Sequence, residues 1–350
     1  MRQASQWIYS KNIDLLTFGG SAAASALLLL VGHVLGILDG DAPWWIWLGL
    51  VLWIDVSHVW ATLFRVYFDP DERKRRLFLY WGTPVFAYVV GVTLYSENAL
   101  WFWRVIAYMA LFHFVKQQLG WLKIYHRKEP SLKNKDVLWD RFALSASMVF
   151  PIVYWHANLS SSHFAWMLVG DFVEINAGIL KIAWPFYLFA MCSYASRRGV
   201  AFWQKKPWSV GKDVLFASTA FCWFAGIVWI GSDYAFTVTN IIIHGVPYLV
   251  LVHYYCRHRV KSSKGVGSRL GAVSLWGLLW TVLVFAFFEE ALWDKLYWAD
   301  KAWLFGSAWP ISPFLEKTMA PLLAVPQLTH YILDGFIWRR KDNPLLEGFL

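Results

Sequence analysis

Charged residues are scarce in this chain. Only 16% of its 350 residues are Asp, Glu, Lys or Arg, and 58% are apolar, whereas soluble domains contain about 25% charged and about 45–50% apolar residues. The mean hydropathy of +0.42 agrees with this bias. A soluble fold of this length has too little interior to bury so much apolar surface. The composition therefore excludes a disordered chain and an ordinary soluble enzyme, and it predicts an integral membrane protein.

Cysteine is also rare. The three cysteines, Cys192, Cys222 and Cys256, lie far apart and form no Cys-x-x-Cys pair. This spacing argues against a disulfide framework, an iron–sulfur cluster and a structural zinc site. The net charge of +9 is explained by basic cytoplasmic loops, which are usual in membrane chains. We therefore expect no nucleic-acid partner.

Long apolar segments run through the whole sequence. We predict about ten membrane-spanning helices of about 20 residues or more, which together form an all-α, polytopic membrane helix bundle with a single transmembrane domain, residues 1–350. The predicted spans are 14–38, 44–68, 77–96, 99–124, 138–157, 176–196, 213–231, 235–256, 270–291 and 318–338. Two outer segments, 158–175 and 292–317, are rich in aromatic residues and are predicted to lie at the membrane interface.

The loops differ sharply in their content of Lys and Arg. Basic residues cluster in 69–76, 126–135, 197–212 and 257–269, and again from Arg339 onward. The loops 39–43, 97–98 and 232–234 contain no Lys or Arg. Because basic residues flank spans on the cytoplasmic side, this alternation predicts that both termini are cytoplasmic. We expect a multi-pass protein of a bacterial cytoplasmic membrane.

Ionisable residues inside a membrane span are costly and are therefore candidates for function. The second, fourth, eighth and tenth predicted spans each carry a histidine with polar partners at helical spacing. These sets are Asp55, His58, Thr62 and Arg65; His113, Lys116 and Gln117; Asn240, His244 and Tyr248; and Gln327, His330 and Asp334. Residues three, four or seven positions apart share one helix face, so each set is expected to face the interior of the bundle.

The four histidines of these sets predict a metal site. Neutral imidazole is a strong ligand for transition metals, so we expect His58, His113, His244 and His330 to converge on one ion. Iron (Fe²⁺) is the expected metal, with another transition metal or haem as alternatives. Histidines within spans also join helices through hydrogen bonds, and that structural role is the alternative for each of them.

Other residues of the same sets are predicted to assist this metal site. Asp55 and Asp334 stand about one turn from a histidine, where a carboxylate can accept the second ring N–H or act as an additional ligand. Tyr248, or Lys116 together with Gln117, is expected to orient oxygen or substrate. Gly245 and Pro247 follow His244, and they predict a kink that frees a backbone carbonyl beside the site.

Short stretches around these histidines resemble one family. The segment Thr329-His330-Tyr-Ile-Leu-Asp334-Gly-Phe-Ile-Trp338-Arg339 looks like the final helix of the bacterial Brp/Blh-type β-carotene dioxygenases. His113-Phe114 resembles the His-Phe box on an early helix of that family, and His58 falls where its first histidine helix would be. The resemblance implies a multi-span membrane oxygenase that holds one iron through histidines on separate helices.

Several function classes follow from these patterns. The first is a non-haem iron oxygenase, dioxygenase-like, that acts on a hydrophobic lipid or isoprenoid substrate. A dioxygenase needs no external electrons, whereas a monooxygenase or desaturase would need a reductase, and an acidic one could dock on the basic loops. The alternatives are a haem or quinone redox protein, a proton-coupled transporter with buried His and Asp relays, and a non-metal lipid enzyme. The HxxHH pattern of two-iron membrane desaturases is missing from the sequence.

Aromatic residues are abundant, with 25 Trp, 16 Tyr and 26 Phe. Many of the tryptophans fall at the predicted span ends, where aromatic belts form. Others, such as Trp53, Trp60, Trp276 and Trp280, lie within spans. We expect part of this surplus to line an apolar tunnel that leads from the lipid to the metal site.

Overall fold

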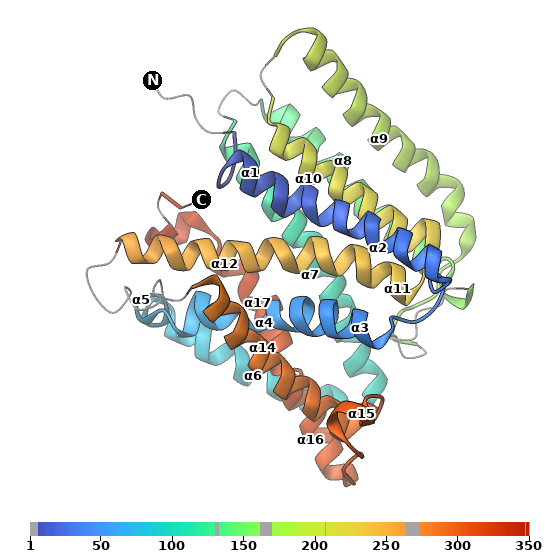
Figure 1. Cartoon of the computed structure of the whole chain (residues 1–350), viewed down its shortest axis with the longest axis vertical. Helices are drawn as coiled ribbons and strands as arrows, with labels where there is room; N and C mark the ends of the chain where they lie inside the picture. Colours follow the sequence, from blue (N-terminus) through green and yellow to red (C-terminus); the bar gives the residue numbers. More distant parts are fainter. Residues whose placement is uncertain are drawn as a thin grey trace. The chain divides into compact units, whose positions relative to one another are not determined.

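The structure of the chain is a computed structural model, shown in Figure 1. It describes residues 6–129, 133–161, 170–206, 208–262, 274–346 and 348–349. Every regular element among these residues is a helix, which confirms the predicted all-α class.

Eight of the described helical segments are long and apolar enough to cross a membrane, judged by length and composition. They are Lys11–Leu35, Trp44–Tyr67, Leu77–Glu97, Asn134–His156, Ala177–Trp203, Val210–Ile230, Asp233–Arg259 and Leu275–Trp298. Each overlaps one of the predicted spans. The fold is therefore that of a multi-pass helical membrane protein.

Two predicted spans are not among these eight. The fourth forms one continuous helix, α7 (Ala99–Arg127), whose Arg104, Lys116 and Lys123 lower its hydropathy. The tenth is broken at Ala324 into α16 (Pro313–Leu323) and α17 (Val325–Ile337), so the prediction of one continuous helix there is wrong. The physical reason is Pro326, which lacks the N–H that would continue the hydrogen-bond ladder.

The chain divides into two compact units, which we describe separately. The first comprises Met1–Leu50 and Leu111–Pro247. Its elements are α1 (Lys11–Asp14), η1 (Leu15–Gly20), α2 (Ser21–Leu35), α3 (Trp44–Ile46), α8 (Asn134–His156), η4 (Leu159–Ser161), η5 (Ala177–Ile179), α9 (Leu180–Trp203), α10 (Val210–Trp223), η6 (Phe224–Ile230), α11 (Asp233–Phe236) and η7 (Thr237–Ile241). Helix α10 packs against both α2 and α8, and α9 covers α8 (Figure 1).

Buried ion pairs and close helix contacts stabilise this first unit. The Lys212 ammonium is only 2% exposed and donates to Glu129 Oε2 at 2.7 Å and Asp140 Oδ2 at 2.8 Å. Tyr125 donates its hydroxyl to the buried Asp14 carboxylate at 2.8 Å. Gly211 lies so close to the Tyr125 ring that an added Cβ would come within 2.5 Å of it. Glycine at this position therefore permits the close approach of α7 and α10.

The second unit comprises Val51–Ala110 and Tyr248–Leu350. Its elements are α4 (Ser57–Trp60), η3 (Leu63–Tyr67), α5 (Pro70–Arg75), α6 (Leu77–Glu97), α14 (Leu275–Trp293), η8 (Asp294–Trp298), α15 (Ala302–Phe305), α16, α17, η9 (Arg340–Asp342) and η10 (Pro344–Leu346). Helix α6 packs against α16 and α17, and α14 packs against α4. Three of the described helices include residues of both units, because a unit boundary falls within them: η2 (Trp47–Val56), α7 and α12 (Ile242–Ser262).

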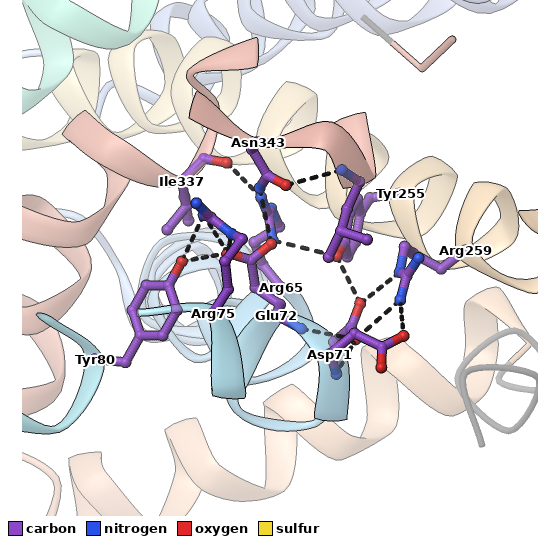
Figure 2. A network of polar contacts seen from close by, with 11 residues as sticks. Arg65, Asp71, Glu72, Arg75, Tyr80, Tyr255, Arg259, Ile337 and Asn343 are labelled. Atoms are coloured by element: carbon purple, nitrogen blue, oxygen red, sulfur yellow. Dashed lines mark hydrogen bonds and ion pairs between the residues drawn. The ribbon is translucent and has the colours of Figure 1, made fainter. Parts of the chain in front are cut away.

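A buried network of charged and aromatic residues connects η3, α5, α12 and α17 in the second unit (Figure 2). Arg65 and Glu72 are fully buried, and Arg65 Nη1 lies 2.8 Å from Glu72 Oε2. Arg65 also donates to Tyr255 Oη at 3.2 Å and to the Ile337 carbonyl. The Asn343 amide donates to Glu72 Oε2 at 2.8 Å, which attaches the C-terminal segment to α5.

Asp69 begins helix α5 and belongs to the same network. Its carboxylate accepts from the backbone N–H of Asp71 and Glu72, and Pro70 occupies the first helical position, where proline is favoured. Burial alone would raise the pKa of Asp69, but hydrogen bonds from Arg259 and Tyr255 outweigh it and hold the pKa below its ordinary value. The sequence Asp69-Pro70 thus forms a helix cap and a charge partner at once.

Wider, π-helical turns interrupt several of these helices. They include η2 and η3, which flank the short helix α4, and η7, which directly precedes α12. In η3 the Phe68 N–H donates to the Leu63 carbonyl at 2.7 Å, five residues back. Such turns change which side chains share a face, and they occur frequently at functional sites.

The two predicted outer segments are described only in part. Residues 162–169 of the segment 158–175, and 270–273 of the ninth predicted span, lie outside the described residues. The segment 292–317 contains η8 and α15, with Trp298, Trp303 and Trp309 between 41% and 60% exposed. Its position at a membrane interface stays a prediction.

Candidate metal centre

Two of the predicted histidines meet in the second unit. His58 lies in α4 and His330 in α17, and they are 1% and 0% exposed. Their ring centroids are 4.9 Å apart, and the rings are almost perpendicular at 84°. The Tyr248 ring lies against both histidines, at 5.8 Å from His58 and 5.0 Å from His330. These three residues, which are far apart in the sequence, therefore form one buried cluster.

The other two predicted histidines meet in the first unit. His113 on α7 and His244 on α12 are 3% and 1% exposed, and their ring centroids are 5.0 Å apart at 86°. The Phe114 ring stacks on His244 with centroids 3.8 Å apart and an angle of 18°. Stacking on one face and an edge contact on another restrict rotation of the His244 ring.

The structure also contains a buried group of histidines that could hold a metal ion. His58, His113 and His244 are all buried, and each offers one ring nitrogen that could bind a metal ion. His330 is not part of this group, although its ring lies beside His58.

The two predicted carboxylates have different neighbours. Asp55 Oδ1 lies 3.6 Å from His58 Nδ1, close to hydrogen-bond distance and one turn earlier on the helix. Asp334 accepts a hydrogen bond from Trp338 Nε1 at 2.8 Å. The group at Nδ1 of His330 is the Thr62 hydroxyl, 2.7 Å away. Thr62 therefore occupies the place that the sequence pattern assigned to Asp334.

The predicted orienting residues also separate. Tyr248 is 1% exposed and lies in the histidine cluster of the second unit. Gln117 is buried on the same face of α7 as His113, and its Nε2 donates to the His244 carbonyl at 2.7 Å. Lys116 is exposed instead, with its ammonium 5.4 Å from the Phe112 ring centroid. Being on the exposed side of α7, it does not share the buried face that was predicted for it.

Gln118 binds the backbone carbonyl that Pro247 leaves without its usual helical donor. Proline lacks an N–H and cannot bond to the carbonyl four residues back, at Ile243. Gln118 Nε2 donates to this carbonyl at 3.1 Å. Gln117 and Gln118 therefore satisfy two backbone carbonyls of α12 next to His244. Sequence reasoning missed Gln118, although two consecutive glutamines in an apolar helix are a signal for such a role.

Some of the tryptophans within spans pack against other side chains, and others are exposed. Trp60 stacks on Phe285 at 4.9 Å and donates to Glu289 Oε2 at 2.6 Å. Trp276 and Trp280 are 65% and 56% exposed, as expected for residues that face lipid. Trp60 follows His58 by two residues, so its ring leaves the helix on a different side.

No family model, curated protein or solved structure matches this chain.

Proposed function

We propose that this chain is an integral membrane metalloenzyme in which His58, His113, His244 and His330 bind one metal ion. The observation that carries the proposal is the burial of all four histidines, which meet in two pairs, His58 with His330 and His113 with His244. Histidine binds metals as neutral imidazole. Burial among apolar helices favours that uncharged form.

We further propose that the metal is iron and that the reaction is that of a non-haem iron oxygenase. Four imidazole ligands would leave two positions open on an octahedral iron, as this class of oxygenase requires. Bound iron would supply the capacity to activate dioxygen. The protein's part is to hold the imidazoles, to keep water out and to orient the substrate. We expect Tyr248 and Gln117 to orient the substrate, and Asp55, which lies 3.6 Å from His58 Nδ1, to orient that ring.

The proposed substrate is a hydrophobic lipid or isoprenoid that enters from the membrane. The stacked Trp60 and Phe285 rings of the second unit support this, because they offer an apolar surface. The resemblance of Thr329–Arg339 to the last helix of the β-carotene dioxygenases favours a polyene. Because the loops differ sharply in their content of Lys and Arg, we propose that the protein lies in a bacterial cytoplasmic membrane. An acidic reductase would be its partner only if the reaction requires external electrons.

The ring geometry favours a single ion over a haem. Two imidazoles on opposite sides of a haem iron have ring centroids more than roughly 6 Å apart, because each nitrogen lies about 2 Å from the metal. The two histidine pairs have centroids 4.9 and 5.0 Å apart. These distances leave no room for a macrocycle between the rings of either pair.

Elemental analysis of the detergent-purified protein tests the proposal. We expect about one iron per chain, and a lower content in His58→Ala, His113→Ala, His244→Ala and His330→Ala. His156→Ala is the matched control, because His156 is also buried but its Nδ1 bonds to the Ile152 carbonyl of its own helix. Full metal content in all four variants would refute the site. A Soret absorbance band would indicate haem instead, and proton flux in liposomes without bound metal would indicate a transporter.

A further inference from the structure

The Thr62 hydroxyl forms the best-defined polar contact of His330. Its Oγ1 lies 2.7 Å from His330 Nδ1, and both residues are buried, at 5% and 0% exposure. The two residues are 268 positions apart in the sequence. Their contact therefore joins the helix that carries His58 to the helix that carries His330.

Local backbone geometry brings Thr62 into this position. Helix α4 ends at Trp60, and the Ala61 N–H is shared between the carbonyls of Ser57 and His58, both at 3.2 Å. Thr62 follows at the start of the wider turns of η3. Because Thr62 comes four residues after His58, it lies on the same helix face. One face thus contacts His330 twice, through the His58 ring and through the Thr62 hydroxyl.

We infer that Thr62 is a positioning residue for His330, and this inference rests on the proposed metal site. With Nδ1–H donating to Thr62 Oγ1, the ring adopts the tautomer whose lone pair is on Nε2. His330 then binds the metal through Nε2 alone. Metal-bound histidines commonly donate their second N–H to an oxygen atom, which fixes the ring and increases its basicity. Asp334 cannot replace Thr62 in this role while Thr62 occupies Nδ1.

The surroundings hold this arrangement in place from two further directions. The Tyr248 ring lies edge-on to His330 with centroids 5.0 Å apart, which limits ring rotation. Seven residues after His330, the carbonyl of Ile337 accepts from Arg65 (Figure 2). The Arg65 guanidinium also lies 4.8 Å from the Trp338 ring centroid. Since Arg65 follows Thr62 by less than one turn, α17 is fixed at two points against one segment.

Titration of the metal-free protein in detergent with Co²⁺ tests the inference. Co²⁺ is a suitable probe because its visible absorbance reports on the ligands, and its affinity is read without any enzyme activity. We expect Thr62→Val to weaken Co²⁺ binding by about 10- to 100-fold, as is typical when the oxygen partner of a metal-bound histidine is removed. The number of Co²⁺ ions bound at saturation should stay the same. Thr62→Ser keeps the hydroxyl and should restore nearly all of the affinity.

Thr329→Val is the matched control. Thr329 is 5% exposed and directly precedes His330, but its hydroxyl has no hydrogen-bond partner among the described residues. This variant should bind Co²⁺ as the unchanged protein does. The thermal unfolding midpoint of each variant, measured without metal, separates loss of the site from loss of the fold.

Two results would overturn the inference while leaving the metal site standing. One is equal Co²⁺ affinity in Thr62→Val and the unchanged protein, when His330→Ala binds weakly. The other is an equal loss in Thr62→Ser and Thr62→Val, because the hydroxyl would then be irrelevant. If the unchanged protein bound no Co²⁺ and no iron, the proposed function would fail and the inference with it.

Discussion

Replacing Glu72 by glutamine removes one charge from the buried network of the second unit and preserves the size of the side chain. Glu72 is fully buried between Arg65, at 2.8 Å, and Arg75. Its neighbours also include the Tyr80 hydroxyl and the Asn343 amide. In Glu72→Gln the Arg65 guanidinium stays buried but loses the carboxylate that balances its charge.

The expected cost follows from this burial. Removing one partner of a buried ion pair typically destabilises a protein by about 3–5 kcal/mol, because a charge is left uncompensated. Arg65 keeps its contacts with Tyr255 and Ile337, so we expect Glu72→Gln to destabilise the second unit by about 3 kcal/mol. For a unit of this size that loss lowers the unfolding midpoint by roughly 6–12 °C.

Buried cysteines provide the assay. Cys256 belongs to the second unit and is 1% exposed, so a thiol-reactive fluorophore labels it only when that unit unfolds. Cys192 and Cys222 are replaced by serine in the background protein, because Cys192 is exposed and Cys222 belongs to the first unit. Asp71→Asn is the matched control on the same helix. Its carboxylate is 60% exposed and pairs with Arg259, and such pairs contribute at most about 1 kcal/mol.

The difference in unfolding midpoint between Glu72→Gln and its parent should decrease as the pH falls. Burial alone would raise the pKa of Glu72, but Arg65 and the hydrogen bonds from Arg75 and Tyr80 outweigh it and hold the pKa below the ordinary value of 4.5. The unfolded chain therefore takes up the proton first as the pH falls. The stabilisation by Glu72 is complete well above pH 4.5 and is lost as the pH falls through the lower, folded pKa. The unfolding midpoints of Glu72→Gln and its parent should therefore converge at that low pH. At pH 7, an unfolding midpoint of Glu72→Gln that is no lower than that of Asp71→Asn would refute the reasoning.

Two further predictions concern the first unit and use the same labelling method with Cys222 as the reporter. Gln118→Leu should destabilise the first unit by about 1–3 kcal/mol, because it leaves the Ile243 carbonyl without a donor. In a Pro247→Ala background, the restored backbone N–H should remove most of this loss of stability. Equal losses of stability in both backgrounds would contradict the role of Gln118 as the donor to Ile243. Gly211→Ala should cost about 1–3 kcal/mol by forcing Tyr125 away from Asp14. Gly82→Ala is the control for Gly211→Ala, because an added Cβ at Gly82 meets nothing within 4 Å; Cys256 is its reporter. Equal losses of stability in the two variants would show that the contact with the Tyr125 ring is not the cause.

Helical periodicity made much of the candidate site predictable. Each of the four histidines, His58, His113, His244 and His330, has a polar residue three or four positions away, and all four are buried. Periodicity failed at Lys116. It put Thr62 on the face of His58, but it could not show that Thr62 contacts His330. Thr62 reaches His330 at a junction between a helix and a wider turn. Lys116 lies on the exposed side of α7, where its ammonium approaches the Phe112 ring.

The sequence by itself determined the class of the protein, because scarce charge and long apolar segments are properties of composition that hold for any packing. It also indicated the spacing of polar residues along each helix, since 3.6 residues per turn is a local property of the backbone. Only the tertiary structure decided which faces meet. Thr62 and His330 are 268 positions apart, and Gln118 and Ile243 are 125 apart. No local pattern encodes such pairs, because they arise from the joint packing of many side chains and from the need to satisfy every buried polar group.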